Sequence, residues 1–349
     1  MTPAYQKLHC TSPLPEGWSE PEILCDTIVA DGITLHRAGL SCTAPGGEEL
    51  TGSAVESTTS PLGRGYFELL ERVSTFEALR EKRSSYELLT AEGDPLGRRA
   101  AEELFPESDA PSRWRYARSN GVALHADWSG AARRALWELV ERDRVLRSWY
   151  GKIRPRRLEF SAAEAGLGLA RSYRWLAYSF PETEDGTEFS RDTHVAGVFG
   201  FPRGAGAPFV CGYGARDDSP SALDAAVRET LQLLGFLWGE PPPERLPDPA
   251  PTPMGHLERL QWPGQQELVR RWLEGAHMPY GAAAGDHGTR SRPQGPGASD
   301  IAFVDLTPSW LGSGLRVAKA ICQAAAPLAF GDAPFASHLP PELRVHPIA

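Results

Sequence analysis

Residues 119–143 read Ser-Asn-Gly-Val-Ala-Leu-His-Ala-Asp-Trp-Ser-Gly-Ala-Ala-Arg-Arg-Ala-Leu-Trp-Glu-Leu-Val-Glu-Arg-Asp, and this stretch decides the fold. It opens with a Ser-Asn-Gly turn, whose hydroxyl, amide and glycine backbone suit a phosphate or a metal-bound water. From about Ser129 to Tyr150, apolar residues recur every three or four positions. This spacing predicts a helix that buries one face and has Ser129 as its N-cap.

The pattern Glu-x-x-Glu-Arg occurs in this helix at residues 138–142 and again at residues 68–72. Two carboxylates three positions apart lie on one helix face and repel each other, which calls for a partner. A solvated face with helical ion pairs is one interpretation of each copy taken alone. The other is Mg²⁺, which is held by a few carboxylates together with phosphate oxygens. Two copies are expected by chance in only a few per cent of chains of this length, so the repetition favours a Mg²⁺-nucleotide site.

The remaining pattern alternates helices with short strands. Helical spacing extends over residues 62–89 and 221–238, with a helix or strand-helix element over 311–325. Strand-like runs rich in aromatic and β-branched residues, bounded by Gly, Pro or Asp, occupy 158–160, 173–180, 193–201, 211–214 and 301–304. The predicted class is α+β.

Composition narrows the function. The chain has 349 residues and is 41% hydrophobic, enough for a globular core. A net charge of -9 gives no global attraction to nucleic acid or to an anionic membrane. No apolar run could span a bilayer and residues 1–16 lack a signal pattern, so we expect a cytoplasmic protein. The five cysteines are widely spaced and are expected to be reduced thiols, with a catalytic nucleophile as the alternative.

The expected organisation is one main domain. Residues 1–50, rich in Pro and Gly, are predicted to be an irregular lead-in with one or two strands and not an independent domain. Residues 51–349 form the nucleotide-binding domain. Two segments, 240–253 and 281–299, are expected to be mobile surface loops, and a Pro-containing tail covers 339–349.

The segment 119–143 resembles the most recognisable motif of the YcaO family in both order and spacing. Residues 52–72 look like the first family motif, 224–232 like the third, and 304–308 with 314–317 like the C-terminal one. The resemblance covers the chain from about residue 50 to the end. It implies a YcaO-like mixed α/β fold with duplicated helix-on-sheet units and a Mg²⁺-ATP site between the glutamate-bearing helices.

The resemblance also implies site residues by motif position. The implied metal ligands are Glu68, Glu71, Glu138, Glu141 and Glu229. The implied nucleotide contacts are Ser57, Arg72, Ser119, Asn120, Arg142, Gln232 and Arg316. No catalytic residue is assigned, although the tail residues His346, Pro347 and Ala349 are the ones that would reach reacting atoms.

The implied reaction is ATP-dependent cyclodehydration in the biosynthesis of a ribosomally made peptide such as a bacteriocin. ATP activates a backbone amide oxygen after Cys, Ser or Thr attacks the carbonyl, and loss of phosphate leaves a thiazoline or oxazoline. The implied partners are the precursor peptide, a separate leader-binding protein of the E1-like or ocin-ThiF-like type, and a flavin-dependent azoline dehydrogenase; a homodimer stays open.

Two departures from the family pattern keep alternatives open. The first motif often carries a Lys beside its glycine, whereas residues 52–54 read Gly-Ser-Ala, so a phosphate contact would have to come from an arginine such as Arg64. The tail ends Val345-His-Pro-Ile-Ala349 in place of a Pro-x-Pro-x-Pro run, and a tail histidine is expected to be solvated. Thioamide formation, amidine formation and a non-catalytic docking subunit are the alternatives.

Overall fold

The computed structural model describes most of the chain. The described residues are 2–107, 113–168, 172–182, 192–204, 206–275, 301–312, 314–333, 336 and 339–349. The loop expected at 281–299 lies outside them. The other expected loop, 240–253, is coil up to the start of helix α6 at Pro253.

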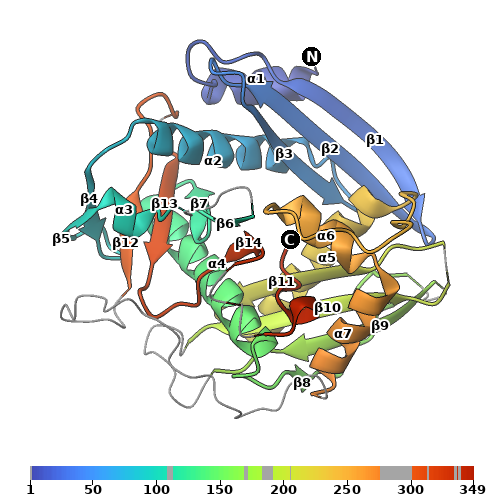
Figure 1. Ribbon diagram of the computed structural model, residues 1–349. Coiled ribbons are helices and arrows are strands. Elements are labelled where there is room, and N and C mark those ends of the chain that lie inside the picture. The colour runs from blue at the N-terminus through green and yellow to red at the C-terminus, as the bar shows by residue number, and fades with distance from the viewer. Residues whose placement is uncertain are drawn as a thin grey trace.

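Helices and strands are interspersed along the chain, as the sequence predicts (Figure 1). The helices are α1 (Pro3–Thr11), α2 (Leu62–Arg80), α3 (Ala101–Leu104), α4 (Trp128–Trp149), α5 (Ser219–Leu237), α6 (Pro253–Leu260), α7 (Pro263–Leu273) and the 3-10 helix η3 (Pro341–Leu343). The strands are β1 (Glu22–Ala30), β2 (Ile33–Thr43), β3 (Glu49–Glu56), β4 (Ser85–Leu89), β5 (Pro95–Ala100), β6 (Trp114–Tyr116), β7 (Val122–His125), β8 (Arg156–Arg157), β9 (Tyr173–Ser179), β10 (His194–Pro202), β11 (Val210–Arg216), β12 (Ala302–Asp305), β13 (Arg316–Ile321) and β14 (Ala329–Gly331).

The larger strands form three antiparallel sheets. Their strand orders are β1-β2-β3, β5-β4-β12-β13-β7 and β11-β10-β9-β8, and β14 pairs separately with β6. Three edge strands, β3, β7 and β11, therefore end the three sheets on one side. These are the strands that the three long helices contact.

Each long helix packs on one sheet and also touches a second. Helix α2 packs on β3 and β2 and reaches β7; α4 packs on β13 and β7 and reaches β11; α5 packs on β11 and β10 and reaches β3. The three helix-and-edge-strand pairs thus close a ring of contacts (Figure 1). Because all three helices carry acidic residues, the ring brings together motifs far apart in the sequence.

Two predicted helix boundaries are wrong. Helix α2 ends at Arg80 and not at residue 89, because Lys82 takes a positive φ of 47° and the chain then enters β4. The N-cap of α4 is Asp127, whose side chain accepts from Gly130 N at 2.7 Å, and not Ser129. Residues 311–325 form strand β13 and turns, with no helix in the described part of this segment.

Most of the predicted strands are confirmed. Strands β9, β10, β11 and β12 confirm the runs at 173–180, 193–201, 211–214 and 301–304. The run at 158–160 is wrong, because pairing stops after β8 and only Leu158 adds one more bond, from its N–H to Ala177 O at 2.9 Å. Residues 1–50 are more regular than their composition indicates, since they form α1, β1 and β2.

The core is divided among the helix faces. The buried stripe of α2 packs with β2, β7 and β13, that of α4 with β9, β10 and α7, and that of α5 with β9, β10 and β3. None of the helices described here combines the length and the apolar character that crossing a bilayer requires.

Candidate Mg²⁺-ATP site

The first helix-strand unit joins α2 to β3 through a glycine. A Cβ on Gly52 would lie 2.3 Å from Gly65 O and 2.4 Å from Leu69 N, so only glycine allows this approach. The close packing lets Glu68 Oε2 accept from Ser53 N at 3.2 Å. The edge strand therefore satisfies part of a carboxylate on the helix that covers it.

The second unit, α4 on β7, repeats the arrangement. Gly121, with a positive φ of 71°, lies where a Cβ would be 3.3 Å from Leu139 Cβ and 3.5 Å from Ala135 O. Its N–H donates to the Glu138 carboxylate. The neighbouring strand amide, Leu124 N, donates to Glu71 Oε2 of α2 at 2.8 Å, so β7 is shared between two acidic helices.

A third unit, α5 on β11, completes the set. A Cβ on Gly212 would lie 2.4 Å from Thr230 N and 2.5 Å from Ala226 O. The next strand amide, Tyr213 N, donates to Glu229 Oε2 at 2.7 Å. The predicted duplication of helix-on-sheet units thus extends to a third copy, in the segment that resembles the third family motif and has Gln232 at its second acidic position.

The three units place the glutamates in register. In each unit the strand glycine contacts one helix residue, which is Leu69, Leu139 or Thr230. The residue just before it is a glutamate, and a second carboxyl or amide side chain follows three positions after that glutamate. We call Glu68, Glu71, Glu138, Glu141 and Glu229 the glutamate cluster. For Glu71 and Glu229 the strand amide engages one oxygen, and no described group hydrogen-bonds the other.

Burial and mutual repulsion raise the carboxyl pKa values throughout the cluster. Burial first, and then the charge of Glu138, raises the pKa of Glu71 from 4.5 to about 8. Burial followed by the charge of Glu229 raises the pKa of Glu141 to about 8 as well. The pKa values of the other three are raised mainly by burial, against the attraction of Arg142 or Arg72. Such a set favours the arrival of a cation.

The donor set fits Mg²⁺ and a nucleotide. Carboxylate oxygens are the ligands Mg²⁺ prefers, and two polar atoms beside them have no hydrogen-bond partner among the described residues, Asn120 Oδ1 and Arg142 Nε. Arg142 Nε lies 3.5 Å from Glu141 Oε1. Within the same residues, no three His, Cys, Asp or Glu side chains are close enough to hold a metal as they stand. The carboxylates are therefore neighbours that would draw together around an ion.

Lys319 is a buried cation of the site that no sequence motif indicated. It lies on β13, and its Nζ donates to Asn120 O at 2.7 Å and Arg118 O at 2.9 Å. Burial lowers its pKa to about 8, against the attraction of Glu138. Lys319 thus fixes the turn at 119–121 from behind and places positive charge beside the cluster.

Arg216 was also missed, because it ends strand β11 two residues beyond the predicted run of 211–214. Its guanidinium lies 4.7 Å from the ring centroid of Trp137, a cation–π contact between β11 and α4. Burial lowers the pKa of Arg216, while the charge of Glu141 opposes that shift. It is a second arginine, beside Arg142, that faces the cluster.

Most of the other predicted nucleotide contacts are exposed, Ser119 among them, whereas Gln232 on α5 is half-buried. Ser57 is exposed in the bend between β3 and α2, and Arg316 is exposed on β13. Arg72 pairs with Glu68 at 2.6 Å, and Arg64 pairs with Glu56. The Glu56 partner leaves the phosphate contact of Arg64 as a prediction.

The C-terminal tail reaches the site, but its histidine is not solvated. His346 is 1% exposed, its Nε2 donates to Ala329 O at 2.9 Å, and its Nδ1 accepts from Ile348 N at 3.3 Å. Burial lowers its pKa to about 4, so it is neutral. Pro347 O accepts from the hydroxyl of Tyr213, the residue whose amide binds Glu229, at 3.1 Å. Ala349 is exposed.

Comparison with known proteins places this arrangement in a family. Residues 99–323, more than half of the chain, match the family described as YcaO cyclodehydratase, ATP- and Mg²⁺-binding. No curated protein sequence matches the chain.

Solved structures share the fold. YcaO from Methanopyrus kandleri, bound with AMPPCP and Mg²⁺, aligns at 15% identity over 93% of this chain and 89% of its own, with a TM-score of 0.56. A heterocyclase in complex with substrate and cofactor aligns at 14% identity over 92% of this chain and 52% of its own, with a TM-score of 0.57. The Escherichia coli microcin synthetase McbBCD complex aligns at 13% identity over 87% of this chain and 88% of its own, with a TM-score of 0.53.

Proposed function

The chain belongs to the YcaO family of ATP- and Mg²⁺-binding cyclodehydratases, and we propose that it cyclodehydrates Cys, Ser or Thr residues of a ribosomally made precursor peptide to thiazolines or oxazolines. ATP supplies the phosphoryl group that makes the amide oxygen a leaving group, and Mg²⁺ offsets the phosphate charge. The observation that carries the proposal is the glutamate cluster, whose buried carboxylates repel one another.

The residues divide into two roles. The five glutamates of the cluster are the metal ligands that we propose, because they lie on three neighbouring helices and carboxylate oxygens suit a hard cation. The nucleotide contacts that we propose are Ser57, Arg72, Ser119, Asn120, Arg142, Gln232 and Arg316. Arg142 is held against Glu141, and the orphaned Asn120 Oδ1 lies in the turn that Lys319 fixes.

The tail contacts the site through Tyr213, and its histidine does not act as a base. Both ring nitrogens of His346 are hydrogen-bonded and its pKa is about 4, so it is neither free nor basic enough to take a proton at neutral pH. Pro347 instead fixes the Tyr213 hydroxyl, and Tyr213 N–H holds Glu229. The nucleophile comes from the substrate, so the enzyme needs none of its own.

We expect the peptide to be presented by a separate leader-binding protein. The microcin synthetase that shares this fold is a complex, McbBCD, which supports a partner here. The test mixes the protein with Mg²⁺-ATP, a candidate partner and a short Cys/Ser/Thr-rich peptide encoded beside it. Mass spectrometry should show the loss of one water for each ring, and Glu141→Gln should prevent it.

An unchanged peptide mass, with a protein that binds Mg²⁺-ATP, would contradict the proposal. A mass change matching replacement of oxygen by sulfur, or condensation with an amine, would assign the same amide activation to thioamide or amidine formation. The exposed Glu267→Gln variant on α7 is the matched control, because it removes one carboxylate far in sequence from the cluster and should leave product formation unchanged.

A further inference from the structure

Strand β9 has an open edge. It pairs with β10 from Tyr173 to Ser179, whereas β8 covers only Ser179 and Tyr178 on its other side. One further bond, from Leu158 N to Ala177 O, ends this contact at 2.9 Å. The chain then departs from the strand, and the rest of the edge receives no partner strand in the described residues.

Part of this edge is already engaged, since Tyr173 O accepts from Arg203 Nε at 2.9 Å and Ala177 O accepts from Leu158 N; the backbone groups of Trp175 between them remain for pairing. Side-by-side strands alternate their bonding direction, and Phe180 N donates towards β10 while Ala177 O accepts from the opposite side. Trp175 therefore points its N–H and C=O away from β10. Within the described chain neither group is hydrogen-bonded, and the N–H of Ala177, a residue 1% exposed, has no partner. An unpaired strand edge of this kind is a template for an added strand.

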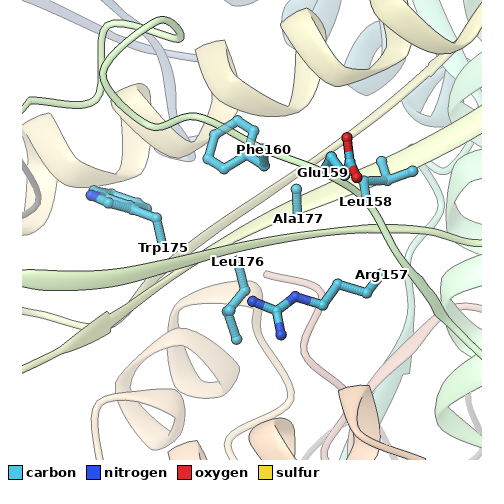
Figure 2. Close-up of a pocket in the computed structure, with 7 residues that line it drawn as sticks. All are labelled: Arg157, Leu158, Glu159, Phe160, Trp175, Leu176 and Ala177. Atoms are coloured by element: carbon cyan, nitrogen blue, oxygen red, sulfur yellow. The ribbon is translucent and has the colours of Figure 1, made fainter.

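A pocket lies along the open edge. Its volume is about 420 Å³, and its lining includes Phe160, Trp175, Leu176 and Arg157. Figure 2 shows Phe160, Trp175 and Ala177 on one side of β9, with Leu176 and Arg157 on the other. The strand edge therefore forms the floor of the pocket, where an extended chain could add.

The two sides of the edge differ in chemistry. Phe160 and Trp175 pack with the apolar cluster beneath α5. On the other face, Arg157 pairs across from Tyr178, and the exposed Arg174 lies on the same face as Tyr178 because side chains alternate along β9. Arg157 and Arg174 form no ion pair among the described residues, nor does Glu159, which also lines the pocket. An added strand would meet aromatic rings on one face and two free guanidinium groups on the other.

We propose that the open edge of β9 binds an extended segment of the substrate peptide in which apolar and acidic residues alternate. This proposal rests on the proposed function, because it names the surface on which that peptide docks. The backbone supplies affinity through hydrogen bonds to the N–H and C=O of Trp175, and the two faces select side chains with a period of two.

The test measures binding of a fluorescein-labelled hexapeptide of alternating Val and Asp by fluorescence anisotropy. We expect saturable binding, and at least a fivefold weaker Kd for the double variant Arg157→Glu/Arg174→Glu, because each exposed ion pair contributes about 0.2–1 kcal/mol and reversal adds repulsion. Arg98→Glu on β5, the open edge of another sheet, is the matched control and should leave the Kd unchanged.

Backbone pairing is tested with two N-methylated peptides. Methylation of every Val amide or of every Asp amide blocks alternate N–H groups, so an added strand should tolerate one set and lose binding with the other. Equal tolerance of both, or no binding at the highest peptide concentration, would overturn the proposal. A dimer that Arg157→Glu/Arg174→Glu dissociates would assign the edge to a second copy and overturn it too.

The same preparations are titrated with Mg²⁺-ATP. If the protein binds Mg²⁺-ATP but not the peptide, the peptide-binding edge of β9 is rejected and the proposed function is not. Loss of nucleotide binding in the unmodified protein would instead contradict the proposed function.

Discussion

The glutamate cluster and the pocket of the tail histidine both bury ionisable groups, but they treat them in opposite ways. In the cluster, carboxylates repel one another and the pKa values of Glu71 and Glu141 rise to about 8. In the tail, His346 has a backbone partner for each ring nitrogen and its pKa falls to about 4. In the first region the carboxyl groups still repel one another beside Arg142 and Lys319, whereas in the second both ring nitrogens have a partner. Burial alone therefore does not identify a ligand site; incomplete satisfaction does.

The largest effect is expected from Lys319→Met, which removes the buried cation of the cluster. The variant leaves two part-buried carbonyls, those of Arg118 and Asn120, without their donor. Hydrogen bonds that involve a charged group contribute about 1.5–3 kcal/mol each, so we expect the free energy of unfolding to fall by about 3 kcal/mol in urea titration. The exposed Lys152→Met variant should stay within about 0.5 kcal/mol of the unmodified protein. Equal stability of both variants would show that the turn does not depend on Lys319.

Glu141→Gln should separate ligand binding from stability. Loss of outer-shell partners alone costs roughly 10- to 100-fold in metal affinity, so we expect at least a tenfold weaker Kd for Mg²⁺-ATP by calorimetry. Without metal, the variant should be more stable than the unmodified protein at alkaline pH. A carboxyl whose folded-state pKa is raised from 4.5 to about 8 stabilises fully below pH 4.5, and this contribution is lost as pH rises through 8. Unchanged affinity with unchanged alkaline stability would remove Glu141 from the cluster's role.

The three acidic helices also show which parts of the site could be predicted from the sequence. The Glu-x-x-Glu-Arg repeats on α2 and α4 were recognisable because side chains three apart share a helix face. The third unit was indicated only by the resemblance of residues 224–232 to a family motif, since Gln232 breaks the Glu-x-x-Glu-Arg repeat and the strand glycine at 212 looks like any turn residue. Lys319 could not be found, because only strand pairing of β13 with β7 brings it to the turn before β7. Motifs within one helix could be predicted from the sequence. The ring of contacts that joins the three helices could not, because it depends on tertiary packing.

The smallest effect is expected at the tail. Because burial lowers the pKa of His346 from 6.5 to about 4, its stabilising contribution is present above pH 6.5 and is lost as pH falls through 4. His346→Gln should cost about 1 kcal/mol at pH 7 and flatten the acid limb of the stability curve. The exposed His194→Gln variant is the control and should keep the wild-type acid limb. An unaltered acid limb in His346→Gln would show that the tail histidine is not the acid-sensitive group.

Proton release on ligand binding tests the central claim most directly, because a cation can occupy the cluster only when the carboxyls are ionised. Titration of Mg²⁺-ATP at pH 7.5 in buffers of different ionisation enthalpy should show about one or more protons released for each nucleotide bound, fewer in Glu141→Gln, and almost none at pH 9.5. Tight binding at pH 7.5 without proton release, or with equal release in Glu141→Gln, would contradict the account of the glutamate cluster as the metal site.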